Sequence, residues 1–389
     1  MSDSYSKRLH VVDALRGFAI VSILLLHNIE HFDFYFTPLN QTNWLIMFNN
    51  GIWESLFFFF GGKSYAIFAL LFGLTYHIQT SNQAIKGKDF RVRFAWRLLL
   101  LLGFGILNSC FYQGDILTIY ALIGFFLIPV TNWSNKAVLI TAIVLMAQPV
   151  EWCNFAIGLF HSNIKLGDPI SWQYFGKMGE YIPQSSFWNT VYGNLTNGKI
   201  GVYLWTWENG RVFQTLSLFM LGMLAGREKL FVLSNLTKRF WRKVLAYAFL
   251  AFLPLYIGKT EIMSLISHEP ISRPLTTIIT SWSNLSFMFI IVASFVLLFQ
   301  RISFHKFLNV FSPIGKMSLS NYILQSILGT FIYYGFGLGL YQYTGATLSF
   351  LIGMALTILQ WYFSKWWLSK YKLGPLETLW HKATWMNNK

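Results

Sequence analysis

Apolar stretches of about twenty residues follow one another along almost the whole chain, and this pattern constrains the fold more than any other feature. A helix needs roughly 20 mainly apolar residues to cross the hydrocarbon core of a bilayer. The pattern therefore predicts an all-α, polytopic integral membrane protein with about ten transmembrane helices. The predicted helices are residues 11–32, 56–79, 94–112, 115–131, 137–160, 207–226, 243–258, 279–300, 318–339 and 346–368.

Positive charge decides the orientation, because cytoplasmic loops of membrane proteins are enriched in Lys and Arg. With the N-terminus inside, 22 of the 30 basic residues fall in inner segments and five in outer ones. Both the N- and the C-terminus are therefore predicted to be cytoplasmic, with the protein in the cytoplasmic (inner) membrane. The same distribution accounts for the net charge of +15 without a nucleic acid partner. The inner set includes Lys7, Arg8 and Lys389, and the outer set includes Lys165.

The chain is predicted to be a single transmembrane helical domain, residues 1–389. Residues 161–206 are too polar to span and rich in Trp and Tyr, which predicts an outer loop lying at the level of the lipid headgroups. The first apolar run lacks a small-residue cleavage site and predicts a retained helix rather than a signal peptide. With only Cys110 and Cys153 present, disulfides and thiolate metal sites are not expected.

The first predicted helix carries most of the polar residues that lie within the membrane. At 100° per residue, Asp13, Arg16, His27 and His31 share one face. Asp13 and Arg16 are three residues apart and can pair, while His27 lies roughly 21 Å further along the helix axis. Ionisable residues inside a membrane usually mark function. Helix packing with an interfacial histidine is the structural alternative.

The spacing of His27 and His31, with Glu30 between them, is one that can hold a metal ion. A third strong ligand is not evident, and on a continuous helix Glu30 points away from the shared face. The sequence therefore predicts no metal site.

Six polar residues are candidates for a substrate pocket: His31, Lys63, Asn108, Asp115, Asn321 and Gln325. Four of them also have a structural alternative. Lys63 can extend its amine to the membrane surface, and Asp115 can stabilise the start of a helix. Asn321 and Gln325 can form hydrogen bonds between helices. The chain has no Gly-x4-Gly-Lys-Ser/Thr motif, which argues against ATP-driven action.

Four segments carry motifs. They are Arg8-x4-Asp13-Ala14-Leu15-Arg16-Gly17 with His27; Arg97 followed by Gly114-Asp115-Ile116-Leu117-x-x-Tyr120-Ala121; Gly315-Lys316-Met317-Ser318-Leu319-Ser320-Asn321-Tyr322-x-x-Gln325-Ser326; and Gly374-Pro375-Leu376-Glu377-x-x-Trp380. The first segment resembles the first helix of the transmembrane acyltransferase superfamily. Together the four resemble the YeiB-like family, a domain of unknown function numbered 418, over almost the whole chain.

The wider superfamily moves acyl groups from cytoplasmic acyl-CoA to acceptors such as sugars. The resemblance therefore implies acyl-CoA as co-substrate, with no tightly bound cofactor. The acceptor would be the hydroxyl or amine of a small molecule, glycan or lipid. Of the residues on the first helix, His27 and Asp13 would be catalytic. Arg16, Arg93 and Arg97 would bind CoA at the cytoplasmic end.

Two other functions are compatible with the same residues. In a transporter or flippase of a small molecule or lipid, the polar face of the first helix would line a pathway. In a non-catalytic membrane protein, it would bind a lipid or another ligand. In all three cases membrane lipids are partners, and a homo-oligomer is left open.

Overall fold

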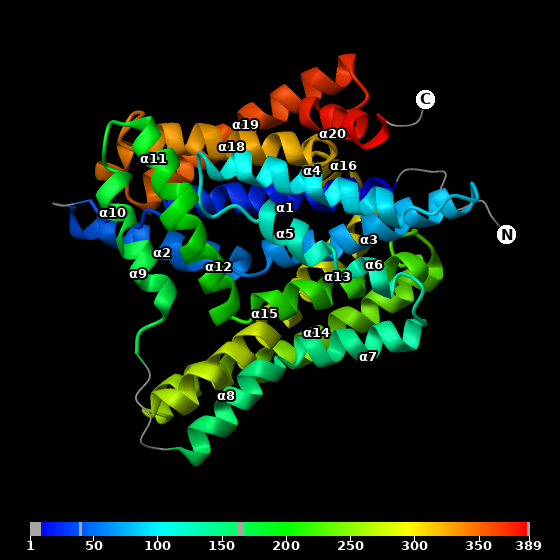
Figure 1. Ribbon diagram of the computed structural model, residues 1–389, viewed down its shortest axis with the longest axis horizontal. Helices are drawn as coiled ribbons and strands as arrows, with labels where there is room; N and C mark the ends of the chain where they lie inside the picture. Colours follow the sequence, from blue (N-terminus) through cyan, green and yellow to red (C-terminus); the bar gives the residue numbers. More distant parts are fainter. Residues whose placement is uncertain (1–8, 39–40, 162–166, 387–389) are drawn as a thin grey trace.

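The computed structural model of the protein describes residues 9–38, 41–161 and 167–386. This described part is all-α and contains no strand (Figure 1). Seven of its segments are long and apolar enough to cross a membrane, which indicates a multi-pass membrane protein. Lys7, Arg8, Lys165 and Lys389, which contribute to the predicted orientation, lie outside the described residues. The seven segments are His10–Ile29, Asn43–Ala84, Arg91–Ser109, Asn135–Phe160, Asn235–Ile262, Glu269–Phe299 and Ala346–Lys370.

Three of the predicted spans form shorter helices than the apolar pattern indicated. The predicted span 115–131 contains α5 (Leu117–Gly124) and α6 (Leu127–Val130). The span 207–226 corresponds to α13 (Arg211–Arg227), and the span 318–339 contains α18 (Ser318–Tyr333). Backbone geometry sets two of the limits. Gly210 has a φ of +63° directly before α13, and the backbone becomes extended at Tyr334 directly after α18. Neither conformation continues a right-handed helix.

The central helix of the bundle is α1 (His10–Ile29), which neighbouring helices bury along nearly its whole length (Figure 1). It packs on α17 (Ser312–Lys316), α19 (Ala346–Lys370) and α3 (Ser64–Ala84). Backbones approach closely at Gly17, where a Cβ would lie 1.9 Å from the carbonyl oxygen of Phe311. A Cβ at Gly315 would lie 1.8 Å from the carbonyl oxygen of Asp13. Two of the four motifs therefore meet backbone to backbone.

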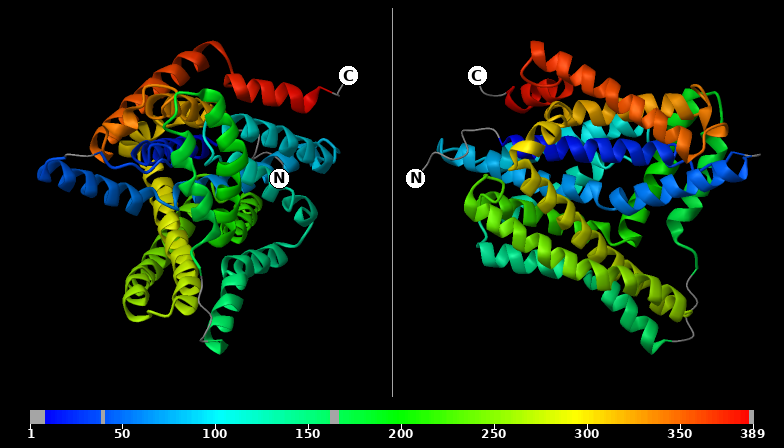
Figure 2. Two further views of the ribbon diagram at one scale, coloured as in Figure 1. Left: turned by 60° about the vertical axis from the view of Figure 1, so that its left-hand side comes forward. Right: turned by 180° about the vertical axis from the view of Figure 1, so that it is seen from behind.

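One largely apolar segment of 42 residues, Asn43–Ala84, comprises α2 (Asn43–Phe60) and α3. At 1.5 Å per residue it would extend roughly 63 Å, about twice what one crossing requires. The turn at 61–63 divides it, and α2 continues beyond the central bundle (Figure 2). Within α2 only Asn49 and Leu56 are buried, and the apolar side chains of Trp44, Met47 and Phe48 near its start are exposed.

A second group of helices lies beside the central bundle, in the lower part of Figure 1. Between the two groups, α13 packs on both α3 and α7. Gly73 and Gly222 bring α3 and α13 into backbone contact, because a Cβ at either would lie 1.9 Å from a carbonyl oxygen of the other helix. The second group consists of α7 (Asn135–Met146), α8 (Pro149–Phe160), α14 (Asn235–Leu265) and α15 (Glu269–Phe299).

Short helices cover the end of the bundle where α1 finishes (Figure 1, green at the left). They lie in the predicted aromatic-rich loop 161–206, of which residues 162–166 are outside the described part. Trp172 and Trp188 are 59% and 75% exposed, as expected of tryptophans at a membrane surface. We call this segment the cap. It comprises α9 (Ile170–Gly176), α10 (Met178–Tyr181), α11 (Phe187–Gly193), a π-helical turn (Asn194–Gly198) and α12 (Lys199–Glu208).

Two helices, α16 (Ile302–Asn309) and α20 (Pro375–Trp385), complete the opposite end of the bundle (Figure 1). Helix α20 lies beside the first turns of α4 (Arg91–Ser109). The Glu377 carboxylate of α20 accepts hydrogen bonds from the backbone N–H groups of Leu319 at 2.7 Å and Ser320 at 3.2 Å. It also accepts one from the Ser320 hydroxyl at 2.5 Å. These N–H groups open α18 and have no partner within the helix, so Glu377 stabilises that end.

Candidate functional site

A cavity of about 620 Å³ lies where α1 ends, beneath the cap. Many of its lining residues are aromatic. Its charged side chains come from the end of α1 and the turn that follows it, and from the start of α13. Such a combination of apolar walls with a few converging polar groups is typical of small-molecule sites. The charged or polar lining residues are His27, Glu30, Asp33, Tyr35, Ser64, Tyr65, Tyr112, Thr206, Arg211, Thr215 and Tyr322.

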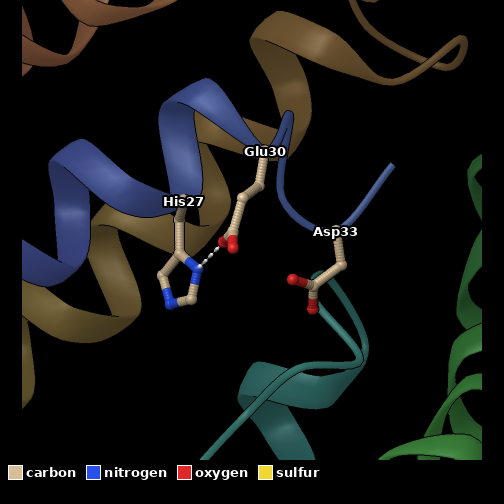
Figure 3. A group of neighbouring side chains, drawn as sticks. All are labelled: His27, Glu30 and Asp33. Atoms are coloured by element: carbon tan, nitrogen blue, oxygen red, sulfur yellow. Dashed lines mark hydrogen bonds and ion pairs between the residues drawn. The ribbon is translucent and has the colours of Figure 1, made fainter. Parts of the chain in front are cut away.

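His27 occupies the last turn of α1 and interacts through one ring nitrogen. Its Nδ1 lies 3.3 Å from Oε2 of Glu30 (Figure 3). The same nitrogen lies 3.1 Å from the hydroxyl of Tyr112. The Tyr112 hydroxyl donates its single proton to Oδ2 of Asp33 at 2.8 Å. Both groups near Nδ1 therefore act as acceptors, so we assign the proton of a neutral His27 to Nδ1. Nε2 is then a proton acceptor, and it has no hydrogen-bond partner among the described residues.

Asp33 reaches His27 because the chain reverses sharply after α1. His31, Phe32 and Asp33 have φ values of 49°, 56° and 64°, a left-handed conformation that costs non-glycine residues on the order of 1–3 kcal/mol each. The backbone N–H of Phe32 donates to the His27 carbonyl at 2.7 Å, and the Phe32 ring is buried, which holds the turn in place. Burial raises the pKa of the Asp33 carboxyl to about 6, and the nearby Glu30 charge adds to this shift.

A glycine makes room for this arrangement on the neighbouring turn. A Cβ at Gly114 would lie 2.2 Å from the Tyr112 hydroxyl and 2.3 Å from Oδ2 of Asp33. The next residues hold the turn against α18, since the N–H of Ile116 donates to the Tyr322 hydroxyl at 3.1 Å. The Gly-Asp-Ile-Leu motif thus shapes one wall of the cavity.

Arg211, at the start of α13, supplies a positive charge to the cavity. Its guanidinium stacks on the rings of Trp205 at 4.0 Å and Tyr65 at 4.5 Å. Glu208 is only three residues away, but it accepts hydrogen bonds from the backbone N–H and hydroxyl of Ser171. Glu208 and Arg211 form no ion pair among the described residues, because Gly210 interrupts the helix between them.

Two predicted pocket residues lie close by but do not line the cavity. Nε2 of His31 is 3.0 Å from the Ser349 hydroxyl and 3.1 Å from the Thr344 hydroxyl, on the side of α1 that faces α19. Burial lowers the pKa of His31 to about 4, so it is neutral near pH 7. The Lys63 amine donates to the carbonyl of Phe57 at 3.4 Å and is largely buried.

Asn108 and Asp115 form a buried polar cluster behind the cavity wall. Asp115 accepts hydrogen bonds from the Asn108 side chain at 3.0 Å and from the backbone N–H of Thr118 at 2.9 Å. The Lys199 amine lies 3.5 Å from the same carboxylate. With these partners Asp115 stabilises the start of α5 and links it to the cap.

Asn321 and Gln325 are fully buried in α18 and are absent from the cavity lining. The Asn321 side-chain amide donates to the Ile314 carbonyl at 3.2 Å and to the Ser364 hydroxyl at 2.9 Å. The Gln325 amide has no hydrogen-bond partner within the described residues.

The predicted CoA-binding residues lie at the opposite end of α1 from His27. Asp13 and Arg16 are 3.7 Å apart, and Arg16 also donates to the Thr75 hydroxyl at 3.0 Å. Arg93 and Arg97 belong to α4, and their guanidinium groups stack on Trp385 at 4.2 Å and Trp380 at 4.1 Å of α20. Neither Asp13 nor any of these arginines lines the cavity.

Sequence reasoning did not select Glu30, Asp33, Tyr112 or Arg211 as site residues. A signal was present, because His27, Glu30 and Asp33 are spaced three residues apart. On a continuous helix Asp33 would lie about 120° around the axis from His27 and roughly 9 Å further along it. Only the left-handed turn brings it back.

The fold and the site together define a class of protein. It is an all-α, multi-pass membrane protein with an ionisable, aromatic-walled cavity at one end of its central helix. Residues 225–387 match the family described as "Protein of unknown function (DUF418)". The chain therefore carries a DUF418 domain, and the resemblance inferred from its motifs is confirmed to this extent.

Three distant relatives support the assignment. The uncharacterized protein YxaH of Bacillus subtilis (strain 168) is 28% identical over 98% of this chain and 95% of its own length. An uncharacterized 39.9 kDa protein of the amylase 3′ region in Bacillus acidopullulyticus is 22% identical, over 97% and 94%. The uncharacterized protein YeiB of Escherichia coli (strain K12) is 32% identical over 22% of this chain and 21% of its own.

Proposed function

We propose that the protein is a membrane acyltransferase that moves an acyl group from acyl-CoA to an acceptor hydroxyl or amine. The observation that carries the proposal is the state of His27. Its Nδ1 faces Glu30, and its Nε2, which has no hydrogen-bond partner in the described part of the chain, lies beside a cavity large enough for an acceptor. A neutral histidine oriented by a carboxylate is a common arrangement for a general base.

In the proposed reaction, Nε2 of His27 takes the proton from the acceptor O–H or N–H. The acceptor atom attacks the thioester carbonyl, its bond to the acyl carbon forms, and the C–S bond breaks. CoA leaves as a thiolate and is then protonated. Glu30 stabilises the imidazolium that forms, and the aromatic walls exclude water that would otherwise hydrolyse the thioester.

The donor would enter from the other end of α1. Arg16, Arg93 and Arg97 would bind the CoA phosphates there, as arginines do elsewhere. Asp13 would orient Arg16, with which it is already paired. Fourteen residues separate Asp13 from His27, which is roughly 21 Å of helix. The acyl-bearing arm would therefore have to extend along α1 to reach the cavity.

The test uses purified protein in nanodiscs with acetyl-CoA as the donor. Calorimetry should show saturable binding that is lost in Arg16→Ala and kept in Arg301→Ala, a matched change at an exposed arginine. Thiol release with glucosamine or glycerol as trial acceptors should fall about 10²–10⁴-fold in His27→Gln, the contribution typical of a general base. Absence of acetyl-CoA binding up to millimolar concentration would refute the proposal.

The same variants separate the alternatives. A transporter or a non-catalytic lipid-binding protein should bind no acetyl-CoA. Either should also tolerate His27→Asn better than an enzyme does, since Asn preserves polarity but accepts no proton near pH 7. Uptake and lipid-binding measurements would then replace the thiol assay.

The proposal includes about ten crossings of the cytoplasmic membrane, with both termini inside. The seven long apolar segments and the placement of basic residues support it. In Cys-free protein, a cysteine at Asp89 should be labelled by a membrane-impermeant maleimide only after the cells are opened. One at Trp188 should be labelled in intact spheroplasts. The reverse pattern would overturn the orientation.

A further inference from the structure

Three potential metal ligands converge at the end of α1. One atom each from His27, Glu30 and Asp33 lies within 4.8 Å of the other two, and all three residues line the cavity (Figure 3). Nδ1 of His27 and Oε2 of Glu30 are 3.3 Å apart, close to the separation of two ligands on one tetrahedral ion. The left-handed turn at 31–33 is what places the third ligand.

The charge around these groups is unbalanced. Two carboxylates lie beside one histidine, and their other hydrogen-bond partners are the neutral hydroxyls of Tyr35 and Tyr112. Arg211 faces the same cavity, yet it stacks on aromatic rings and forms no ion pair with either carboxylate among the described residues. A site with two carboxylates, of which Glu30 is buried, and one imidazole is short of positive charge, which a divalent cation would supply.

We propose that Nδ1 of His27 and the carboxylates of Glu30 and Asp33 bind a divalent transition metal ion of the Zn²⁺ class. Imidazole nitrogen and carboxylate oxygen are ligands that such ions accept, at about 2.0–2.2 Å. Small movements of the three side chains would bring them to this distance. A fourth position would face the cavity, and the Tyr112 hydroxyl between His27 and Asp33 would have to yield.

Metal binding would exclude the action of His27 as a base. An ion on Nδ1 requires the imidazole proton to lie on Nε2, so Nε2 could no longer accept a proton from an acceptor. The ion is therefore expected to inhibit acyl transfer. This consequence rests on the proposed function, whereas the binding itself does not.

The binding test uses full-length protein without a polyhistidine tag, treated with chelator and placed in nanodiscs. Titration with Zn²⁺ should show one site, and Co²⁺ should give visible absorption bands of a four-coordinate ion. Losing an outer-shell partner of a metal typically costs 10–100-fold in affinity, so losing a direct ligand should cost about 100-fold or more. We expect this loss for each of His27→Gln, Glu30→Gln and Asp33→Asn.

Matched controls change the same residue types elsewhere. His305→Gln and Asp89→Asn lie outside the cavity and should leave Zn²⁺ affinity unchanged. Glu30→Asp retains a carboxylate on a shorter arm and should weaken binding less than Glu30→Gln, provided that both elute as monodisperse protein. Binding that survives in the three ligand variants would overturn the proposal, as would no binding by the parent protein.

Activity distinguishes this proposal from the proposed function. Zn²⁺ binding without any acyl transfer would refute the acyltransferase and leave the metal site standing. Transfer that Zn²⁺ inhibits and chelator restores would support both. If acyl transfer required Zn²⁺, the inference that metal binding prevents His27 from acting as a base would be wrong.

Discussion

The two ends of α1 hold polar side chains in different ways. At its start, Asp13 pairs with Arg16, and Gly17 packs directly on the backbone of α17. At its end, His27, Glu30 and Asp33 face a cavity of about 620 Å³ and are held by a strained turn. Polar groups that have partners on every side stabilise a fold, whereas polar groups that face space are available to a ligand. Along one helix, the comparison separates charges that are already paired from charges that face a cavity.

The largest expected effect on stability comes from adding a side chain at the close backbone contact near the start of α1. In Gly17→Val, the new side chain meets the carbonyl oxygen of Phe311, and no flexible group can move aside. Overpacking costs about 1–3 kcal/mol where side chains can adjust, and a backbone clash should reach or exceed the upper limit. Thermal unfolding in detergent should show the loss. Gly103→Ala, in open space on α4, should behave like the parent protein.

Gly114→Ala makes a similar change at the other end of α1, with a different expected outcome. Its Cβ would displace the ends of Tyr112 and Asp33, which are side chains rather than backbone. Stability should fall by only about 1 kcal/mol, while Zn²⁺ affinity and acyl transfer should both drop at least tenfold. If Gly114→Ala unfolds the protein as readily as Gly17→Val does, the distinction between the two ends fails.

Asp33→Asn tests the end of α1 through the pH dependence of the protein's folding stability. The pKa of Asp33 is raised in the folded protein from 3.8 to about 6, so the fold favours the protonated form. The associated stability is present below about pH 4 and is lost as the pH rises to about 6. In chelator-treated protein, Asp33→Asn should match the parent at pH 4 and exceed it above pH 6, by up to about 3 kcal/mol. Melting curves across this range would check it; a constant difference would contradict it.

The smallest expected effect concerns Arg97. Its guanidinium stacks on Trp380 and donates to Thr384 at 3.3 Å, so part of its role is to hold α20. A double-mutant cycle with Arg97→Gln and Trp380→Leu should give a coupling energy of about 0.5–2 kcal/mol in thermal stability. If Arg97 also binds CoA, Arg97→Gln should weaken acetyl-CoA binding more than Trp380→Leu does. Equal effects on acetyl-CoA would assign Arg97 to structure alone.

Periodicity and charge were sufficient to predict an all-α membrane protein and the position of its first helix. The prediction for that helix, residues 11–32, fails only at its end. There a uniform helix places His31 on the face of His27, whereas the left-handed turn directs His31 toward Ser349 and returns Asp33 to the cavity. Consecutive non-glycine residues with positive φ have no local sequence signature, because tertiary packing of Phe32 maintains them.

Other site features depend on contacts distant in sequence. Tyr112 lies in the turn after α4 and Arg211 opens α13, and nothing in either segment marks these residues as neighbours of His27. The stacking of Arg93 and Arg97 on α20 joins residues far apart in the chain. A pattern within a single helix cannot report such contacts, and neither the helical cap nor the tryptophans of α20 could be placed from periodicity alone.

The bonds from Glu377 to the start of α18 also set an order of events during synthesis. Ser320 and its acceptor are 57 residues apart, with the whole of α19 between them. While the ribosome is still making α19, the first N–H groups of α18 have no carboxylate to receive them. This end of the bundle can therefore close only after α19 has entered the membrane. A nascent chain stopped before Glu377 would present an unfinished helix end, a feature by which a membrane protease could distinguish it from the completed protein.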